Sequence, residues 1–222
     1  MDGKVVSREI RREVWPLLRS SGFTRFTSRT AWRESGDRID VVNFQSFNSY
    51  LAESVGCTTF SFALNLGCCL AYIPLSFSGG KKRRQFPAEY ECHFRYHLSK
   101  SIKQPELPRL NIWLIKERGA YLAESIADAK AVLQRDGIPW FERFAQREIV
   151  LAGLLNDETF WESGTRTSPQ RNYLAGYVAL ATNERAIAAA HLLSALQSGC
   201  FKRDENELRT EIEKLGKPDS LL

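Results

Sequence analysis

The chain has 222 residues, of which 43% are hydrophobic and 26% charged, with a formal net charge of +5. These values are ordinary for a globular protein that buries a substantial core. No apolar run approaches the ~18 to 20 residues that a membrane span needs. Positions 1–14 alternate in charge and lack the apolar stretch of a secretory signal. We therefore expect a cytoplasmic protein without a membrane segment.

The five cysteines support this expectation. Their number is odd, and Cys68 and Cys69 are neighbours within a strand pattern. Adjacent strand residues point to opposite faces, which is poor geometry for chelating zinc. Reduced thiols in a cytoplasmic protein are the better interpretation.

The first predicted element is a helix over residues 7–20, with Ser7 as its N-cap. Its apolar residues recur at helical spacing: Ile10, Val14, Leu17 and Leu18. Pro16 lies inside this pattern and predicts a kink or a break after Val14. Ser21-Gly22 then ends the helix.

A run of strands is predicted next. Residues 23–33 and 38–46 alternate in polarity and flank a short turn at 34–37, so they form a plausible hairpin. A polar loop over 48–56 leads to a long third strand at 57–73, in which Gly67 marks a bulge or a close backbone approach. One or two further strands are expected at 89–98 and 110–116.

Beyond Gly119 the pattern becomes helical. Apolar spacing and capping residues predict helices over 121–134, 139–156, 168–181, 183–197 and 205–215. The third and fourth of these are rich in alanine and are typical of a helical hairpin like one tetratricopeptide unit. The predicted fold class is α+β, with an N-terminal helix on an antiparallel sheet of four to five strands. We expect a sheet domain over 1–118 and a helical extension docked on it over 119–222.

Short motifs in the first half carry a resemblance to a known family. They are Gly22-Phe23 after the first helix, Trp32-Arg33, Gln45-Ser46 at one strand end and Asn65-Leu66-Gly67 near another. This order resembles a bacterial family described as domain of unknown function four thousand three hundred and four. The resemblance covers about residues 7–150 and implies an α+β fold and a bacterial origin. It brings no reaction or cofactor, and its link to immunity factors is an association at the level of fold.

Primary amides interrupt two of the apolar strands and form the main candidate site. If Phe44, Phe60, Phe62, Leu64 and Leu66 face the core, alternation places another set on the opposite face. That set is Arg33, Asn43, Gln45, Ser61 and Asn65. A guanidinium beside amides could recognise an anion or a peptide backbone. The same amides could instead hold neighbouring strands or a crossing loop together.

The basic run Lys81, Lys82, Arg83 and Arg84 is the second candidate site. It follows Ser78-Gly79-Gly80. Its pattern is typical either of a solvated loop between strands or of a segment that contacts a phosphate backbone. It lacks interleaved aromatic residues of the kind that stack single-stranded bases.

Motifs of catalysis and metal binding are scarce. Cys92, His93 and His97 could suggest a metal cluster, but on a strand the two histidines would be ~13 Å apart. The sequence has no H-E-x-x-H, paired C-x-x-C, G-x-S-x-G or Walker A motif. We expect no metal and no cofactor, and nothing in the sequence selects a nucleophile and its base.

These observations predict a non-enzymatic, cytoplasmic bacterial protein that binds another protein, for example as an immunity or accessory factor. The alternative is a nucleic-acid or nucleotide-associated module that uses the basic run and the amide face. A third hypothesis is an enzyme whose site is assembled from Arg33, Gln45 and Asn65. The first predicts an exposed apolar patch, the second salt-sensitive retention on nucleic acid, and the third an enclosed pocket over the amides.

Overall fold

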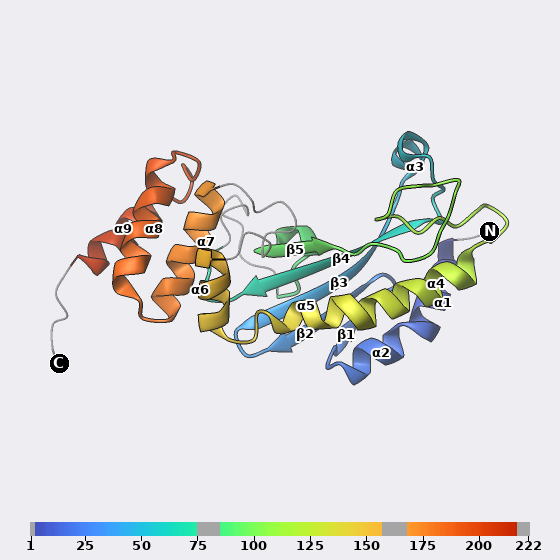
Figure 1. Ribbon diagram of the computed structural model, residues 1–222, viewed down its shortest axis with the longest axis horizontal. Coiled ribbons are helices and arrows are strands. Elements are labelled where there is room, and N and C mark those ends of the chain that lie inside the picture. The colour runs from blue at the N-terminus through green and yellow to red at the C-terminus, as the bar shows by residue number, and fades with distance from the viewer. Residues whose placement is uncertain (1–2, 75–84, 157–167, 217–222) are drawn as a thin grey trace.

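The computed structural model describes residues 3–74, 85–156 and 168–216. It contains an N-terminal helical pair, a five-stranded antiparallel sheet and a series of helices in the second half (Figure 1). The predicted α+β class is thereby confirmed, as is its order of helix, sheet and C-terminal helices. No helix in the described ranges is both long enough and apolar enough to cross a bilayer.

The N-terminal helix is broken where proline predicted it. Helix α1 spans Gly3–Glu13 and α2 spans Trp15–Ser20, with Pro16 in the first turn of the second helix. Proline is tolerated there because the first helical N–H groups have no intrahelical acceptor. Gly22 follows with φ of 87°, a left-handed conformation that ends the helix and turns the chain into the sheet.

The sheet has its strands in chain order, and each pairs antiparallel to the next. Their bounds are Arg25–Phe26 for β1, Thr30–Ser35 for β2, Arg38–Ser46 for β3, Phe62–Leu70 for β4 and Phe94–His97 for β5. The hairpin between β2 and β3 was predicted correctly. The expected strand at 23–33 is instead two strands, because the chain turns at Thr27, whose Oγ1 accepts from Thr30 N at 2.9 Å.

Two segments between the strands differ from expectation. The predicted polar loop at 48–56 contains helix α3, Ser49–Val55, with Asn48 Oδ1 accepting from Leu51 N at 2.8 Å. The expected strand at 110–116 is reduced to a single bridge between Phe62 and Trp113. A short 3₁₀ turn, Glu89–Glu91, precedes β5.

A long helical arm follows the sheet. Helix α4, Leu122–Val132, continues through a π-helical turn, Leu133–Gly137, into α5, Ile138–Glu142. The predicted break between the helices at 121–134 and 139–156 is therefore wrong: Gly137 lies between them with φ of −72°, and the helix passes through it. A Cβ at this position would come within 2.7 Å of Leu133 Cδ1 and 3.2 Å of Leu98 Cδ1. Glycine is needed there for packing and not for a turn.

Between residue 147 and residue 216, the described part of the chain contains four helices: α6, Arg147–Asn156, α7, Ser168–Ala181, α8, Arg185–Gln197, and α9, Glu205–Leu215. Helices α7 and α8 form the expected close hairpin. A Cβ on Gly176 would lie 2.5 Å from Leu192 Cδ2, so the two helices approach at a glycine. These helices lie beyond one end of the sheet, opposite the end that carries α3 (Figure 1).

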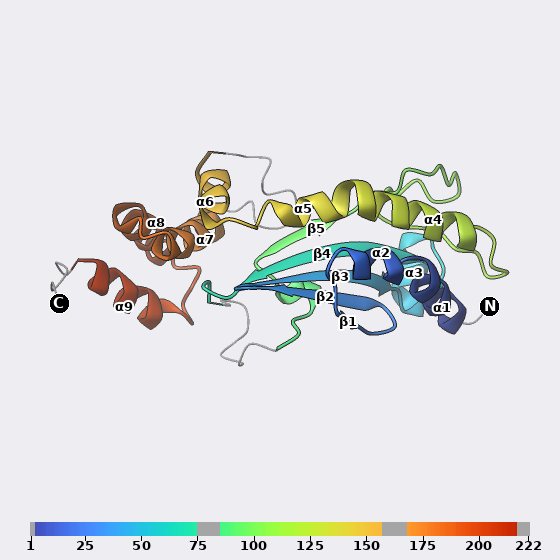
Figure 2. The same cartoon turned by 90° about the horizontal axis from the view of Figure 1, so that it is seen from below.

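Helices α1, α2, α4 and α5 cover one face of the sheet, and this face holds the core (Figure 2). A series of aromatic rings crosses it, with centroid separations of 5.7 Å for Trp15–Phe44, 5.3 Å for Phe44–Phe62 and 5.6 Å for Phe62–Trp113. Because α4 and α5 share this core with the strands, they pack on the sheet although they follow residue 118. The proposed division into 1–118 and 119–222 stays a prediction.

Candidate functional site

Three of the predicted site residues come together on the sheet face opposite the helices. In the register of β3 and β4, Asn43 lies opposite Asn65 and Gln45 opposite Ala63. Residues paired in this way project to the same face of a sheet. Asn65 Nδ2 donates to Gln45 Oε1 at 2.7 Å, so two of the predicted amides are hydrogen-bonded to each other.

A histidine that the sequence argument had not assigned to this face extends the group. His97 lies opposite Asn65 on β5, and its Nδ1 is 2.7 Å from Asn65 Oδ1. The amide row, defined here as Gln45, Asn65 and His97, thus crosses three adjacent strands. Asn65 is 2% exposed, whereas Gln45 and His97 at the two ends are exposed. The row is therefore both an internal latch and an accessible polar surface.

The chemistry of the row follows from its hydrogen bonds. Because Asn65 Oδ1 can only accept, the His97 nitrogen beside it carries a hydrogen in this orientation of the amide. Partial burial lowers the pKa of His97; Glu89 opposes that shift and Arg95 adds to it. Neutral imidazole leaves Nε2 as an acceptor at one end of the row. The exposed carboxamide of Gln45 supplies both donors and an acceptor at the other end.

The prediction that Arg33 joins these amides is wrong. Arg33 pairs with Asp40 across the β2–β3 hairpin, so it shares the face of Val42 and Phe44, on the helix side of the sheet. The two-residue turn at Gly36 and Asp37 sets this register, and a shift of one residue would have reversed the face. An enzyme site built from Arg33, Gln45 and Asn65 is excluded by the same geometry.

On the helix side, Arg33 belongs to a buried charged cluster. Its Nε lies 2.8 Å from Asp40 Oδ2, and its Nη2 lies 2.9 Å from Glu142 Oε1 at the end of α5. Arg38 Nε lies 3.3 Å from the other oxygen of Asp40, and its Nη1 donates to the Phe141 carbonyl at 2.9 Å. Loss of hydration raises the pKa of Asp40, although both arginines act in the opposite direction. The cluster joins the hairpin to the helical arm and is a structural element.

Ser61 is also separate from the amide row. It precedes β4 and is fully buried, and its Oγ accepts from Ile115 N at 3.1 Å and from Thr58 N at 3.3 Å. Strand alternation does not apply here because residues 58–61 form a turn. Ser61 therefore connects the loop after Trp113 to the sheet through hydrogen bonds. The residues next to it in the sequence do not indicate this role.

An apolar part of this face is covered. Trp32, Ile39, Val41 and Cys69 pack with Cys92, which belongs to the segment that crosses beneath the sheet. Trp32 Nε1 donates to the Pro87 carbonyl at 2.8 Å. At Gly67 an added Cβ would lie 2.8 Å from Cys92 Sγ and 3.0 Å from the Glu89 carbonyl. The predicted close backbone approach at Gly67 is thus present. Within the described residues, Gln45 and His97 at the amide end of the face are exposed.

The other candidate groups do not assemble into a site. Within the described ranges, no three His, Cys, Asp or Glu side chains are placed to hold a metal ion. His93 Nδ1 instead accepts from Leu70 N at 3.0 Å, and His191 bonds to Asn172 at 2.8 Å. The basic run, Lys81, Lys82, Arg83 and Arg84, lies outside the described residues.

Comparison with known proteins identifies the family. Residues 14–143, more than half of the chain, match the family described as a domain of unknown function, DUF4304. The chain belongs to this family, as its strand motifs indicated. The matched region begins at the end of α1 and extends through α5, so it includes the whole sheet and the helical arm that covers it. No curated protein and no solved structure matches the chain.

Proposed function

We propose that the chain is a non-enzymatic interaction protein that binds another protein through the amide row and the adjacent Asn43. The observation that carries this proposal is the hydrogen-bonded arrangement of Gln45, Asn65 and His97 across three strands. Hydrogen bonds to the buried Asn65 hold the exposed donors and acceptors of Gln45 and His97 in place. Little side-chain entropy is therefore lost when a partner binds. Amide and imidazole groups match the N–H and C=O groups of a polypeptide backbone.

The proposal includes a cytoplasmic, bacterial setting and a role as an immunity or accessory factor. The five cysteines form no disulfide with one another, which fits a reducing compartment. The immunity role can be tested by gene order: a gene for a toxin domain directly upstream in several genomes would support it. A neighbourhood without such genes would contradict the immunity role and leave protein binding to be tested separately.

Binding can be tested by comparing three forms of the full chain as bait in lysate of the native bacterium. The wild type should retain one protein at a defined stoichiometry, and purified partner should bind it in a calorimeter. The double variant Gln45→Ala/His97→Ala removes both exposed ends of the row and should bind at least tenfold more weakly. Because it leaves the buried Asn65 amide without these partners, its fold and stability are checked by circular dichroism before binding is compared. Leu193→Ala, on the exposed side of α8, is the matched control and should bind like wild type.

Two results would contradict the proposal. One is partner affinity that does not change in the double variant. The other is an equal loss in Leu193→Ala, which would place the interface elsewhere. The alternative proposal, a nucleic-acid or nucleotide-associated module, predicts salt-dependent retention on DNA or RNA. Replacing Lys81, Lys82, Arg83 and Arg84 by serine should abolish that retention, whereas Gln45→Ala/His97→Ala should not.

A further inference from the structure

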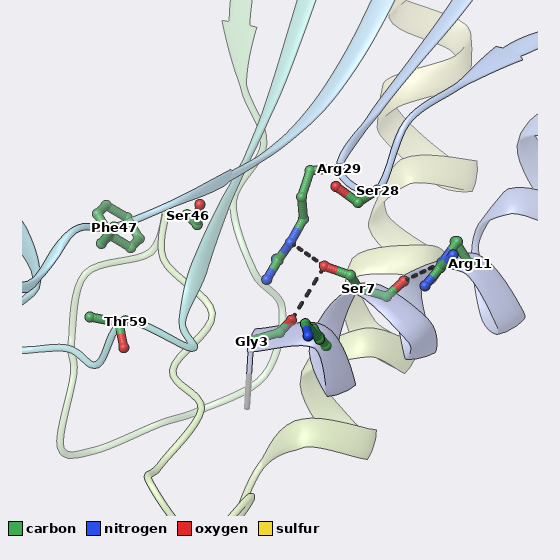
Figure 3. Close-up of a pocket in the computed structure, with 9 residues that line it drawn as sticks. Gly3, Ser7, Arg11, Ser28, Arg29, Ser46, Phe47 and Thr59 are labelled. Carbon is green, nitrogen blue, oxygen red and sulfur yellow. Dashed lines mark hydrogen bonds between the residues drawn. The ribbon is translucent and has the colours of Figure 1, made fainter. Parts of the chain in front are cut away.

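A pocket of about 430 Å³ lies beside the first turns of α1, away from the amide row (Figure 3). It is bordered by α1, by the turn between β1 and β2, by the end of β3 and by the turn before β4. Its described lining includes three cationic side chains, Lys4, Arg11 and Arg29, and several hydroxyl groups, but no carboxylate. Among these described lining residues, no carboxylate lies beside the cationic Arg29.

Arg29 is held in place from both its backbone and its side chain. Its carbonyl accepts from Phe44 N at 2.8 Å, which fixes the turn to β3. Its Nε donates to Ser7 Oγ at 3.0 Å, and the Ser7 hydroxyl in turn donates to the Gly3 carbonyl at 3.3 Å. Figure 3 shows the guanidinium extending past Ser7 toward the space in front of Gly3. The cation is therefore pre-positioned at the start of a helix.

The charge on Arg29 lacks a counter-ion in the described part of the chain. Burial lowers the pKa of Arg29, and no carboxylate counters this shift. Arg33, by contrast, pairs with Asp40 and Glu142. The Nη1 atom of Arg29 is buried without a hydrogen-bond partner among the described residues. A desolvated guanidinium with unused donors is costly unless an anion accompanies it.

We propose that this pocket binds the phosphate group of a small phosphorylated molecule. The planar donors of Arg29 suit a phosphate oxygen pair, and Arg11 on α1 brings a second guanidinium to the lining. The volume exceeds what inorganic phosphate alone would fill and lies in the range of small-ligand pockets. Phe47, on the side away from α1, offers an apolar surface to the body of the molecule.

The test is a titration followed by amide chemical shifts in two-dimensional NMR, with chloride at equal ionic strength as the reference. The three probes are inorganic phosphate, ribose 5-phosphate and adenosine monophosphate. Each should give saturable shifts at residues 3–7 and 28–29, with the two esters binding at least threefold more tightly than inorganic phosphate. Tighter binding of the nucleotide than of the sugar phosphate would identify a base contact; equal binding would identify the sugar phosphate as the recognised unit.

Three variants make the result decisive. Arg29→Met should weaken phosphate binding at least tenfold, whereas Arg209→Met removes the same charge from α9 and should change it less than twofold. Ser28→Glu places a carboxylate at an exposed position in the pocket and should also abolish binding while the fold is kept. Shifts that do not saturate, or equal losses in Arg29→Met and Arg209→Met, would overturn the proposal. So would full binding by Ser28→Glu.

Discussion

Replacement of Gly67 by alanine is the sharpest test of how the covered part of the sheet is packed. Gly67 lies in the middle of β4, where its backbone contacts the segment that precedes β5. A Cβ would meet Cys92 Sγ at 2.8 Å, Cys92 Cβ at 3.0 Å and the Glu89 carbonyl oxygen at 3.0 Å. Two of these atoms cannot move without the backbone, so the segment 89–92 or the strand itself must shift.

Overpacking of this kind costs about 1–3 kcal/mol. Alanine has less conformational entropy than glycine in the unfolded chain, and this difference stabilises the folded state by less than about 1 kcal/mol. We therefore expect Gly67→Ala to lower the free energy of unfolding by about 2 kcal/mol. With a urea dependence of about 2–3 kcal/mol per molar, the midpoint followed by circular dichroism should fall by about 0.7–1 M.

A second substitution shows whether the predicted contact is the cause. Cys92→Ala removes the nearest atom, so Gly67→Ala should cost about 1 kcal/mol less in that background than in the wild type. Gly216→Ala is the control, because its nearest non-bonded atom is 3.7 Å away and its φ is −77°; its effect should stay within ~0.5 kcal/mol. A cost below ~0.5 kcal/mol for Gly67→Ala, or strict additivity with Cys92→Ala, would refute the reasoning.

Three further predictions concern charge, thiols and pH. Arg33→Met leaves the Asp40 carboxylate buried beside a single arginine and should lower the free energy of unfolding in urea by about 3–5 kcal/mol. Arg209→Met removes an exposed ion pair and should lower it by less than ~1 kcal/mol. Similar losses in the two variants would contradict the role given to burial. A thiol reagent should modify exposed Cys200 in the native protein and reach Cys92, whose pKa is raised by burial, only after unfolding, as peptide mapping would show. The pKa of His97, followed by NMR, should lie below its ordinary 6.5. Because the unfolded chain then takes up the proton first, the contribution of His97 to stability should be full above about pH 6.5 and decline as the pH falls through the folded pKa, a dependence that His97→Gln should remove.

The sheet was predictable because its two long strands carry a regular pattern. Within β3, residues 42–45 alternate between apolar and polar side chains, which was enough to place Val42 and Phe44 on the core face and Asn43 and Gln45 on the other. The side of Arg33 was missed because its pairing partner on the next strand was not worked out from the turn. With Gly36 and Asp37 as the turn residues, Ser35 pairs with Arg38 and Arg33 must pair with Asp40. Even the predicted four-residue turn at 34–37 would have paired Arg33 with Arg38, on the same face as Asp40 and away from Asn43 and Gln45.

The remaining errors arise where local signals are weak or tertiary packing overrides them. Helix α3 has an N-cap at Asn48 and a left-handed Gly56, but its seven residues lack an apolar stripe. Gly137 looks like a helix end because only the packed structure shows the leucines that require it. The pocket around Arg29 joins four segments, and no pattern within any one of them indicates that they meet.

The hydrogen bonds of the amide row all run in the same sense across the strands. His97 donates to Asn65, and Asn65 donates to Gln45, so the row has an acceptor at its β5 end and amide donors at its β3 end. A polypeptide segment laid over it in one orientation would find complementary groups at both ends, whereas in the reverse orientation the acceptor at the His97 end would lack a donor. Rotation of the single Asn65 amide by a half-turn would reverse both ends together. The orientation of the buried Asn65 amide therefore sets the direction in which a polypeptide segment would fit this otherwise exposed surface.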